Sequence, residues 1–225
     1  MRDVNLRTRC LSALWAVSLL GPVAGLAQAQ DGSGVDAEVK RALEAKADPV
    51  RGKAEFEDCS PCHRKDAAGR ANGSIPRLSG QHASVIVKQV IDIRNGRRVN
   101  AQMKPVLEDP TINAQVVADI AAYLQGLPIV GQIGKGPGTG LARGKTLYDR
   151  DCAGCHGASG EGRAAKFFPM VAAQHYGYLL RELNMIRTGE RGNSDPEMVK
   201  LIKPYSSDDL QAVADYMAQL PPPKR

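Results

Sequence analysis

The chain has 225 residues, of which 43% are apolar and 24% are charged, and its 30 Lys and Arg against 24 Asp and Glu give a formal charge of +6. These values are ordinary for a globular protein and exclude wholesale disorder. The length allows one large domain or two small ones. The aromatic residues are few, with three Phe, six Tyr and one Trp. Two domains with so few aromatic side chains need another apolar group to fill their cores.

Residues 1–29 have the features of a secretory signal peptide. Arginines precede an apolar run over residues 11–20, and the small-residue sequence Ala27-Gln28-Ala29 follows it. The run is shorter than the roughly 20 residues that span a bilayer. This favours cleavage after Ala29 over the alternative, an uncleaved membrane anchor, and we expect the mature chain in the periplasm.

Residues 30–48 form an N-terminal leader that precedes the recognisable motifs. Four apolar residues in it, Val35, Val39, Ala42 and Leu43, fall at helical spacing. The leader is therefore predicted to contain a short amphipathic helix.

Cleavage removes Cys10 and leaves two C-x-x-C pairs, each followed directly by histidine. The two motifs are Cys59-Ser-Pro-Cys62-His63 and Cys152-Ala-Gly-Cys155-His156. C-x-x-C-H is the attachment motif of c-type haem, because thiols one turn apart reach the two vinyl groups of a porphyrin and the adjacent imidazole reaches its iron. We predict two covalently bound haem c groups, with the four cysteines as thioethers and both histidines as iron ligands. A redox disulfide and half of a zinc site are the alternatives, but Cys62 and Cys152 are too far apart for a zinc ribbon.

The two motifs belong to an internal repeat with an offset of 93 residues. Several pairs keep this offset: Pro76 with Pro169, Gln81-His82 with Gln174-His175, Arg94 with Arg187, Gly96 with Gly189, and Tyr123 with Tyr216. The repeat predicts two tandem domains, residues 49–128 and 141–221. The segment between them, residues 129–140, is glycine-rich and reads as a linker.

Each copy is predicted to contain three helices and no strand. The first helix starts near Pro49 or Leu141 and ends at the haem motif. The middle helix follows the Gln-His pair and is capped by Gly96 or Gly189. The last helix carries periodic apolar residues in both copies and opens in the second copy at Ser206-Ser-Asp-Asp209, which resembles a capping box. The fold class is therefore all-α.

These motifs, over roughly residues 49–221, resemble class I cytochromes c and, more closely, the di-haem cytochrome c4 family. The resemblance implies two small helical bundles, each around a covalent haem. It implies that Gly52 and Gly144 let the first and last helices cross closely, and that Phe56 and Tyr148 meet the last helix near Tyr123 and Tyr216. It also implies that the Pro76 and Pro169 carbonyls accept a hydrogen bond from the haem-binding histidines, which would orient them.

Met103 and Met198 are predicted as the second axial ligands, opposite His63 and His156. Both are expected in the loop before the last helix, where the resembled family has its distal methionine. His82 and His175 are the alternative, because each follows its haem motif at the same distance; we interpret them instead as surface residues at a helix start. Five arginines are candidates for the haem propionates, or alternatively solvated cations: Arg94, Arg97, Arg98, Arg187 and Arg191.

Two protein ligands on each iron leave no open site for a substrate, which predicts an electron carrier and not an enzyme. We expect an exported shuttle to a terminal oxidase or another respiratory reductase. Its partners would be redox proteins such as a membrane oxidase, a reductase or a quinol-oxidising complex. Loose association with a membrane is possible, and no nucleic-acid partner is expected. The alternatives are a haem subunit of a dehydrogenase complex, for example in sulfur-compound oxidation, and a structural or sensing haem protein.

Overall fold

The computed structural model describes residues 32–223, which fall in one compact unit. The predicted signal peptide, residues 1–29, and Cys10 lie outside the described residues. Within that range all regular elements are helical, and the isolated bridge Arg163–Phe168 is the only β-type pairing, which confirms the all-α class. None of these helices is long and apolar enough to cross a membrane. The leader and domain 1 contain α1 (Gly32–Glu44), α2 (Pro49–Glu55), α3 (Ser60–His63), α4 (Ala83–Arg94), α5 (Lys104–Leu107) and α6 (Ala114–Gly126). Domain 2 contains α7 (Leu141–Leu147), α8 (Ala153–His156), α9 (Tyr176–Thr188), α10 (Pro196–Ile202) and α11 (Ser207–Gln219).

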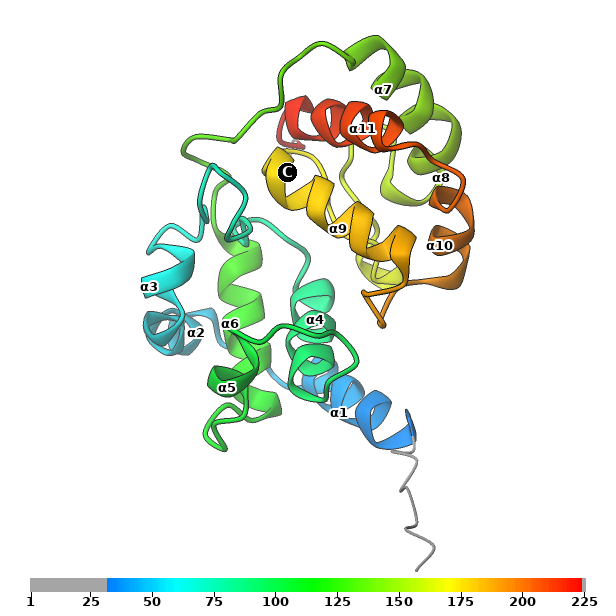
Figure 1. Ribbon diagram of the computed structural model, residues 1–225. Coiled ribbons are helices and arrows are strands. Elements are labelled where there is room, and N and C mark those ends of the chain that lie inside the picture. The colour runs from blue at the N-terminus through cyan, green and yellow to red at the C-terminus, as the bar shows by residue number, and fades with distance from the viewer. Residues whose placement is uncertain (1–31, 224–225) are drawn as a thin grey trace, which may run out of the picture. The chain divides into compact units, whose positions relative to one another are not determined.

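The first and last helices of each domain cross at a glycine. Helix α2 packs on α6 and α7 packs on α11 (Figure 1). A Cβ on Gly52 would lie 2.0 Å from the Asp119 carbonyl oxygen, and one on Gly144 would lie 2.1 Å from that of Ala212. No side chain fits at either position, so glycine is required for the backbones to approach this closely.

An aromatic pair closes each crossing. The ring centroids of Phe56 and Tyr123 are 5.8 Å apart, and those of Tyr148 and Tyr216 are 5.5 Å apart, both in tilted arrangements. These contacts confirm what the family resemblance implied.

The helix boundaries follow the predicted caps with one difference. Ser206 and Asp209 form the full capping box at the start of α11, and α9 ends at Gly189 with φ of 81°. Helix α4 is capped instead by Asn95, with φ of −86° and ψ of 8°, and Gly96 follows it with φ of 75°. The predicted cap, Gly96, therefore lies one residue beyond the observed cap in domain 1.

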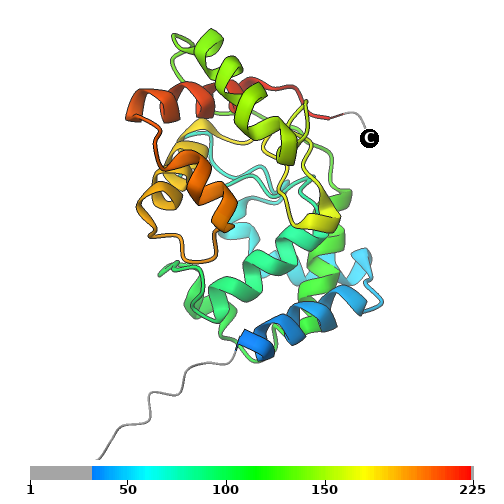
Figure 2. The same ribbon diagram turned by 90° about the vertical axis from the view of Figure 1, so that its right-hand side faces the viewer.

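The leader helix α1 is part of the domain 1 core. It packs against α4 and α6 (Figure 2), with Val39 and Ala42 buried and Leu43 43% exposed. Glu38 pairs with Arg94 at the end of α4. The predicted amphipathic helix is confirmed, and its apolar face extends the core of a small domain.

The glycine-rich linker is held in place by two buried side chains. Arg77 donates to the Val130 and Gln132 carbonyls at 2.6 and 3.3 Å, and the Asp215 carboxylate accepts from the Gly136 and Gly138 amides at 2.9 and 2.6 Å. A Cβ on Gly136 would lie 2.6 Å from the Asp215 carboxyl carbon, and Gly138 has φ of 79°, so both glycines suit this bound conformation of the linker.

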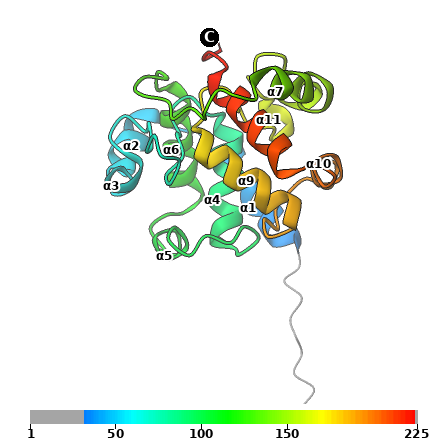
Figure 3. The ribbon, with the colours of Figure 1, turned by 45° about the horizontal axis from the view of Figure 1, so that its top comes forward.

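The two domains contact each other through residues that the repeat makes equivalent. Gln81 of domain 1 bonds both the amide and the carbonyl of Met170, and Gln174 of domain 2 bonds both the amide and the carbonyl of Arg77. Met170 and Arg77 are themselves 93 residues apart. The interface is thus isologous in pattern, as in a two-fold dimer. Each domain keeps its own apolar core, and in domain 2 the core lies where α9 packs against α10 and α11 (Figure 3).

Candidate functional site

Each C-x-x-C-H motif forms one tight helical turn after a break in the first helix. In domain 1, α2 passes through a 3₁₀ turn at Phe56–Asp58 into α3, and the His63 amide donates to the Cys59 carbonyl at 3.0 Å. In domain 2, α7 passes through a π-helical turn at Tyr148–Cys152 into α8. Both cysteines and the histidine of each motif therefore lie on one short segment, as attachment to one porphyrin requires.

The backbone turns sharply after each histidine. In domain 2 the His156 Nδ1 then lies 2.9 Å from the Pro169 carbonyl oxygen, which fixes the ring and leaves Nε2 for a ligand. In domain 1 the Pro76 carbonyl faces His63 in the same way and raises its pKa, although burial has the larger, opposite effect. No hydrogen bond forms between this carbonyl and the ring, so His63 Nδ1 is a buried polar atom without a partner among residues 32–223.

The protonation states of the motif residues suit haem attachment. All four described cysteines are free thiols, and burial raises the pKa of Cys59 to about 11 and of Cys152 to about 12. Stable thiols of this kind argue against a redox-active thiolate pair. Burial also lowers the pKa of His63 and His156, which favours the neutral imidazole that binds a metal.

The residues present fit haem better than a bare metal ion. Within residues 32–223 no three His, Cys, Asp or Glu side chains group closely enough to hold an ion alone. Each motif instead supplies two thiols and one imidazole on one short segment, which is the set of groups that covalent haem attachment requires.

Both candidate methionines are positioned by a side-chain cap. Met103 is the N-cap residue of α5, and its amide donates to Asn100 Oδ1 at 3.1 Å; the Met198 amide donates to Asp195 Oδ1 at 3.3 Å. Both side chains are half-buried, and Met198 packs against the domain 2 core. Met198 lies in α10, so the loop expected around it is wrong; Pro196 at the first turn starts the helix there.

His82 and His175 stand at the starts of α4 and α9, as expected, and both contact the other domain; the interpretation as a surface residue is wrong for His175, which is buried, while His82 is half-buried. The His82 Nε2 lies 2.8 Å from the Glu161 carbonyl oxygen of domain 2, and the His175 Nε2 lies 2.7 Å from that of Ala68 in domain 1. His175 has no exposed surface, and its Nδ1 accepts from the Gly134 amide at 3.1 Å. Both nitrogens of His175 are thus occupied by backbone groups.

The five arginines divide into two groups. Arg94 and Arg187 tie the middle helix of each domain to equivalent backbone carbonyls, those of Ile112 and Tyr205, and are accounted for structurally. Arg97, Arg98 and Arg191 lie in a buried polar cluster between the domains, with acidic partners Asp92 and Glu182.

Sequence reasoning missed the interface residues, above all Gln89, Glu182 and Arg77. The 93-residue offset relates Gln89 to Glu182 and was a signal that could have found this pair.

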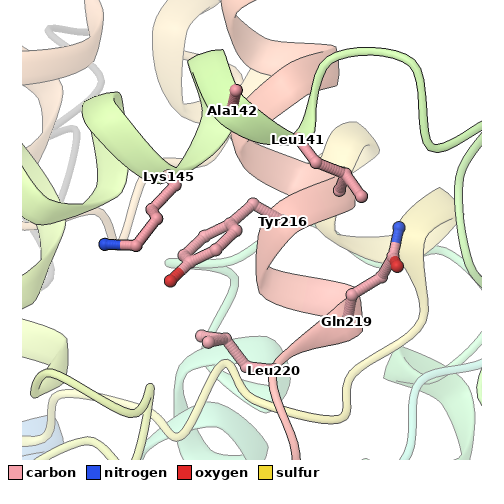
Figure 4. A pocket seen from close by; sticks show the side chains of 6 residues that line it. All are labelled: Leu141, Ala142, Lys145, Tyr216, Gln219 and Leu220. Carbon is pink, nitrogen blue, oxygen red and sulfur yellow. The ribbon is translucent and has the colours of Figure 1, made fainter.

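A shallow apolar pocket of about 280 Å³ lies beside the α7–α11 crossing, with Leu141 and Tyr216 on facing sides (Figure 4). Its lining includes none of the candidate cysteine, histidine or methionine ligands, so it is separate from the haem motifs.

Comparison with known proteins agrees with this geometry. The sequence model of the cytochrome c family matches residues 49–128 and 141–221. The thiosulfate dehydrogenase electron acceptor of Stutzerimonas stutzeri is 36% identical over 176 residues, which cover 72% of this chain and 78% of that protein.

Two solved structures are also similar. Reduced recombinant cytochrome c4 from Pseudomonas stutzeri superposes with a TM-score of 0.69 and 27% identity, over 77% of this chain and 99% of that one. Thiosulfate dehydrogenase (TsdBA) from Marichromatium purpuratum superposes with a TM-score of 0.67 and 28% identity, over 77% of this chain but only 40% of the longer chain.

Proposed function

The chain belongs to the cytochrome c family as a di-haem electron carrier of the cytochrome c4 type with two covalently bound haem c groups, and we propose that it is an exported shuttle that delivers electrons to a terminal oxidase or another respiratory reductase. The observation that carries the proposal is the match to cytochrome c4, which extends over 99% of that chain and therefore includes both haem domains. The features of the first 29 residues support export to the periplasm.

We assign the haem contacts to the residues that the two motifs bring together. Cys59 and Cys62 in domain 1, and Cys152 and Cys155 in domain 2, would form the thioether bonds. His63 and His156 would bind iron through Nε2, because Nδ1 of His156 is already directed at a carbonyl. The haem supplies reversible one-electron chemistry; the protein residues hold it, orient its axial ligands and limit water around it.

Met103 and Met198 complete this assignment as the distal ligands. A thioether favours the reduced metal relative to a second imidazole and so raises the reduction potential. The alternative ligands, His82 and His175, are engaged at the domain interface. A metal with two protein ligands has no open position for a substrate, which supports an electron carrier.

A second candidate function is that of electron acceptor for a thiosulfate-oxidising dehydrogenase. The support is the 36% identity to a thiosulfate dehydrogenase electron acceptor and the structural match to part of a thiosulfate dehydrogenase. In this reading the chain accepts electrons from such an enzyme, either as a free carrier or as a subunit, and the same haem sites serve both roles.

Stopped-flow spectroscopy distinguishes the two candidate functions. The oxidised protein is mixed with a purified thiosulfate dehydrogenase and thiosulfate, and the reduced protein is mixed with respiratory membranes. Rapid oxidation by membranes supports the shuttle, and rapid reduction that requires the dehydrogenase supports the second candidate. Failure of membranes to oxidise the protein would contradict delivery to an oxidase. The shuttle also requires recovery in the periplasmic fraction with Gln30 at the N-terminus.

A further inference from the structure

A closed ring of four side chains joins the two domains. Arg98 of domain 1 donates to Gln89 of its own domain at 2.9 Å and to Glu182 of domain 2 at 2.9 Å. Arg191 of domain 2 donates to Glu182 of its own domain at 2.9 Å and to Gln89 of domain 1 at 3.1 Å. Within the ring, each arginine therefore bonds one residue of its own domain and one residue across the interface.

The ring follows the repeat, with one exception. Arg98 and Arg191 are 93 residues apart, and so are Gln89 and Glu182. A strict repeat would place the same residue at the last two positions. Here a neutral amide occupies one position and a carboxylate the other, so a single negative charge faces the two ring arginines. Arg181 also approaches this carboxylate from outside the ring, at 3.7 Å.

The ring is shielded from solvent, so water or a salt ion cannot easily take the place of the carboxylate as a partner of the arginines. The side chains of Arg98, Glu182 and Arg191 are only 11%, 10% and 15% exposed. Burial lowers the pKa of Arg191, and the nearby Arg98 lowers it further. Two cations held this close in a poorly solvated site repel each other, and the carboxylate between them offsets that repulsion.

Within the described residues no second carboxylate is hydrogen-bonded to the side chains of these two arginines, although the charge of nearby Asp92 acts to raise the pKa of Arg191. Tyr178 accepts from Arg98 through its hydroxyl at 3.0 Å, and Asn193 donates to Gln89 at 3.1 Å and to Asp92 at 2.7 Å. Asp92 is paired with Lys88 and Arg97. Within the described residues, Glu182 is therefore the one carboxylate that the ring arginines share.

We propose that Glu182 is a positioning residue for electron exchange between the two haems: its carboxylate links Arg98 to Arg191, holds the haem domains in one arrangement and lowers the reduction potential of both. The inference rests on the di-haem carrier function. Glu182 acts through the two arginines and not by contact with an iron ligand. A negative charge between the domains stabilises the oxidised, more positive iron on either side.

The repeat itself supplies the test variants. Glu182→Gln leaves both arginines without a carboxylate. The double variant Gln89→Glu with Glu182→Gln moves the carboxylate to the equivalent position in domain 1, with the same composition and net charge as the natural protein. Glu190→Gln, an exposed glutamate in the same domain, is the matched control for loss of one negative charge.

The holoprotein of each variant is measured by calorimetry and by spectroelectrochemical titration. Glu182→Gln is expected to split or broaden the unfolding transition, because the domains uncouple, and to raise both midpoint potentials. The exchanged double variant is expected to restore one cooperative transition and to return both potentials toward the natural values. Glu190→Gln is expected to change neither property.

Two results would overturn the proposal. One is a Glu182→Gln protein with unchanged potentials and unchanged unfolding. The other is a double variant that behaves like Glu182→Gln, because the carboxylate would then be needed at its own site and not as a bridge between the arginines. If Glu182→Gln fails to fold, the double variant still decides, since it keeps the charge and both cross-domain bonds.

Discussion

Arg64 and Gly157 follow the histidines of the two haem motifs and share one backbone conformation. Arg64 has φ of 70° and ψ of 156°, and Gly157 has φ of 82° and ψ of 158°. This region is open to glycine and costs other residues of order 1–3 kcal/mol. The repeat thus shows an unstrained residue in domain 2 and a strained one at the equivalent point of domain 1.

Arg64→Gly is therefore expected to stabilise domain 1. The relief of strain exceeds the loss of the exposed Arg64–Asp66 contact, which is worth at most about 1 kcal/mol, and the added freedom of the unfolded chain. We expect a net gain of about 1 kcal/mol in the free energy of unfolding, measured by urea denaturation of the holoprotein. Gly157→Ala should have the opposite sign, because alanine is strained at φ of 82° and its Cβ would also displace the Glu161 side chain. A loss of stability in Arg64→Gly would show that no strain is stored there.

Gly134→Ala is expected to destabilise the protein through the linker. An added Cβ would lie 1.6 Å from the Ala71 carbonyl oxygen, a backbone atom that cannot move aside alone. Overpacking of this kind costs about 1–3 kcal/mol or more, and a calorimetric scan should show the loss. Gly126→Ala serves as the control, since nothing lies within 4 Å of its added Cβ. Equal melting temperatures for the Gly134 variant and the natural protein would mean that the linker is not held as described.

His175 is expected to make stability pH-dependent. Burial lowers its pKa, and the nearby Arg77 contributes. The unfolded state therefore binds a proton near pH 6.5 while the folded state still does not, so stability is full above about pH 6.5 and falls as the pH decreases below it. Protonation of Nδ1 would also break the bond from the Gly134 amide. Urea unfolding between pH 5 and 8 should show this slope, and His175→Gln should reduce it. A variant with the natural slope would exclude His175 as its source.

Met103→His is expected to lower the potential of one haem and leave the other nearly unchanged. An imidazole in place of a thioether favours the oxidised iron. Redox titration should therefore show one shifted and one unshifted step. Met198→His is the matched variant, and it should move the other step. If Met103→His left both steps in place, Met103 would not be the ligand.

The elements that confer the fold could be read from the sequence because their signals are local or repeated. The capping box at Ser206 could be predicted because it involves only residues close together in the sequence. The glycines at the helix crossings could be predicted because they follow the pattern of the resembled family. The interface could not be read in the same way. His175 and Glu182 have ordinary sequence neighbours, and their roles come from contacts with the other domain, which no local pattern encodes.

The helix around Met198 was missed for a related reason. Asp195 and Pro196 form a helix start that competes with the family expectation of a loop, and the local signal prevailed. The glycine-rich linker shows the reverse: its composition favours flexibility, but Arg77 and Asp215 fix it through contacts from distant parts of the chain.

The ferric spectrum of the natively exported holoprotein tests the central claim most directly, because it reports the ligands of both irons at once. We expect two low-spin haems, each with the weak near-infrared band of methionine bound to iron. A high-spin haem that binds cyanide readily would show an open iron site and would contradict the assignment of the protein as an electron carrier with histidine and methionine on each iron.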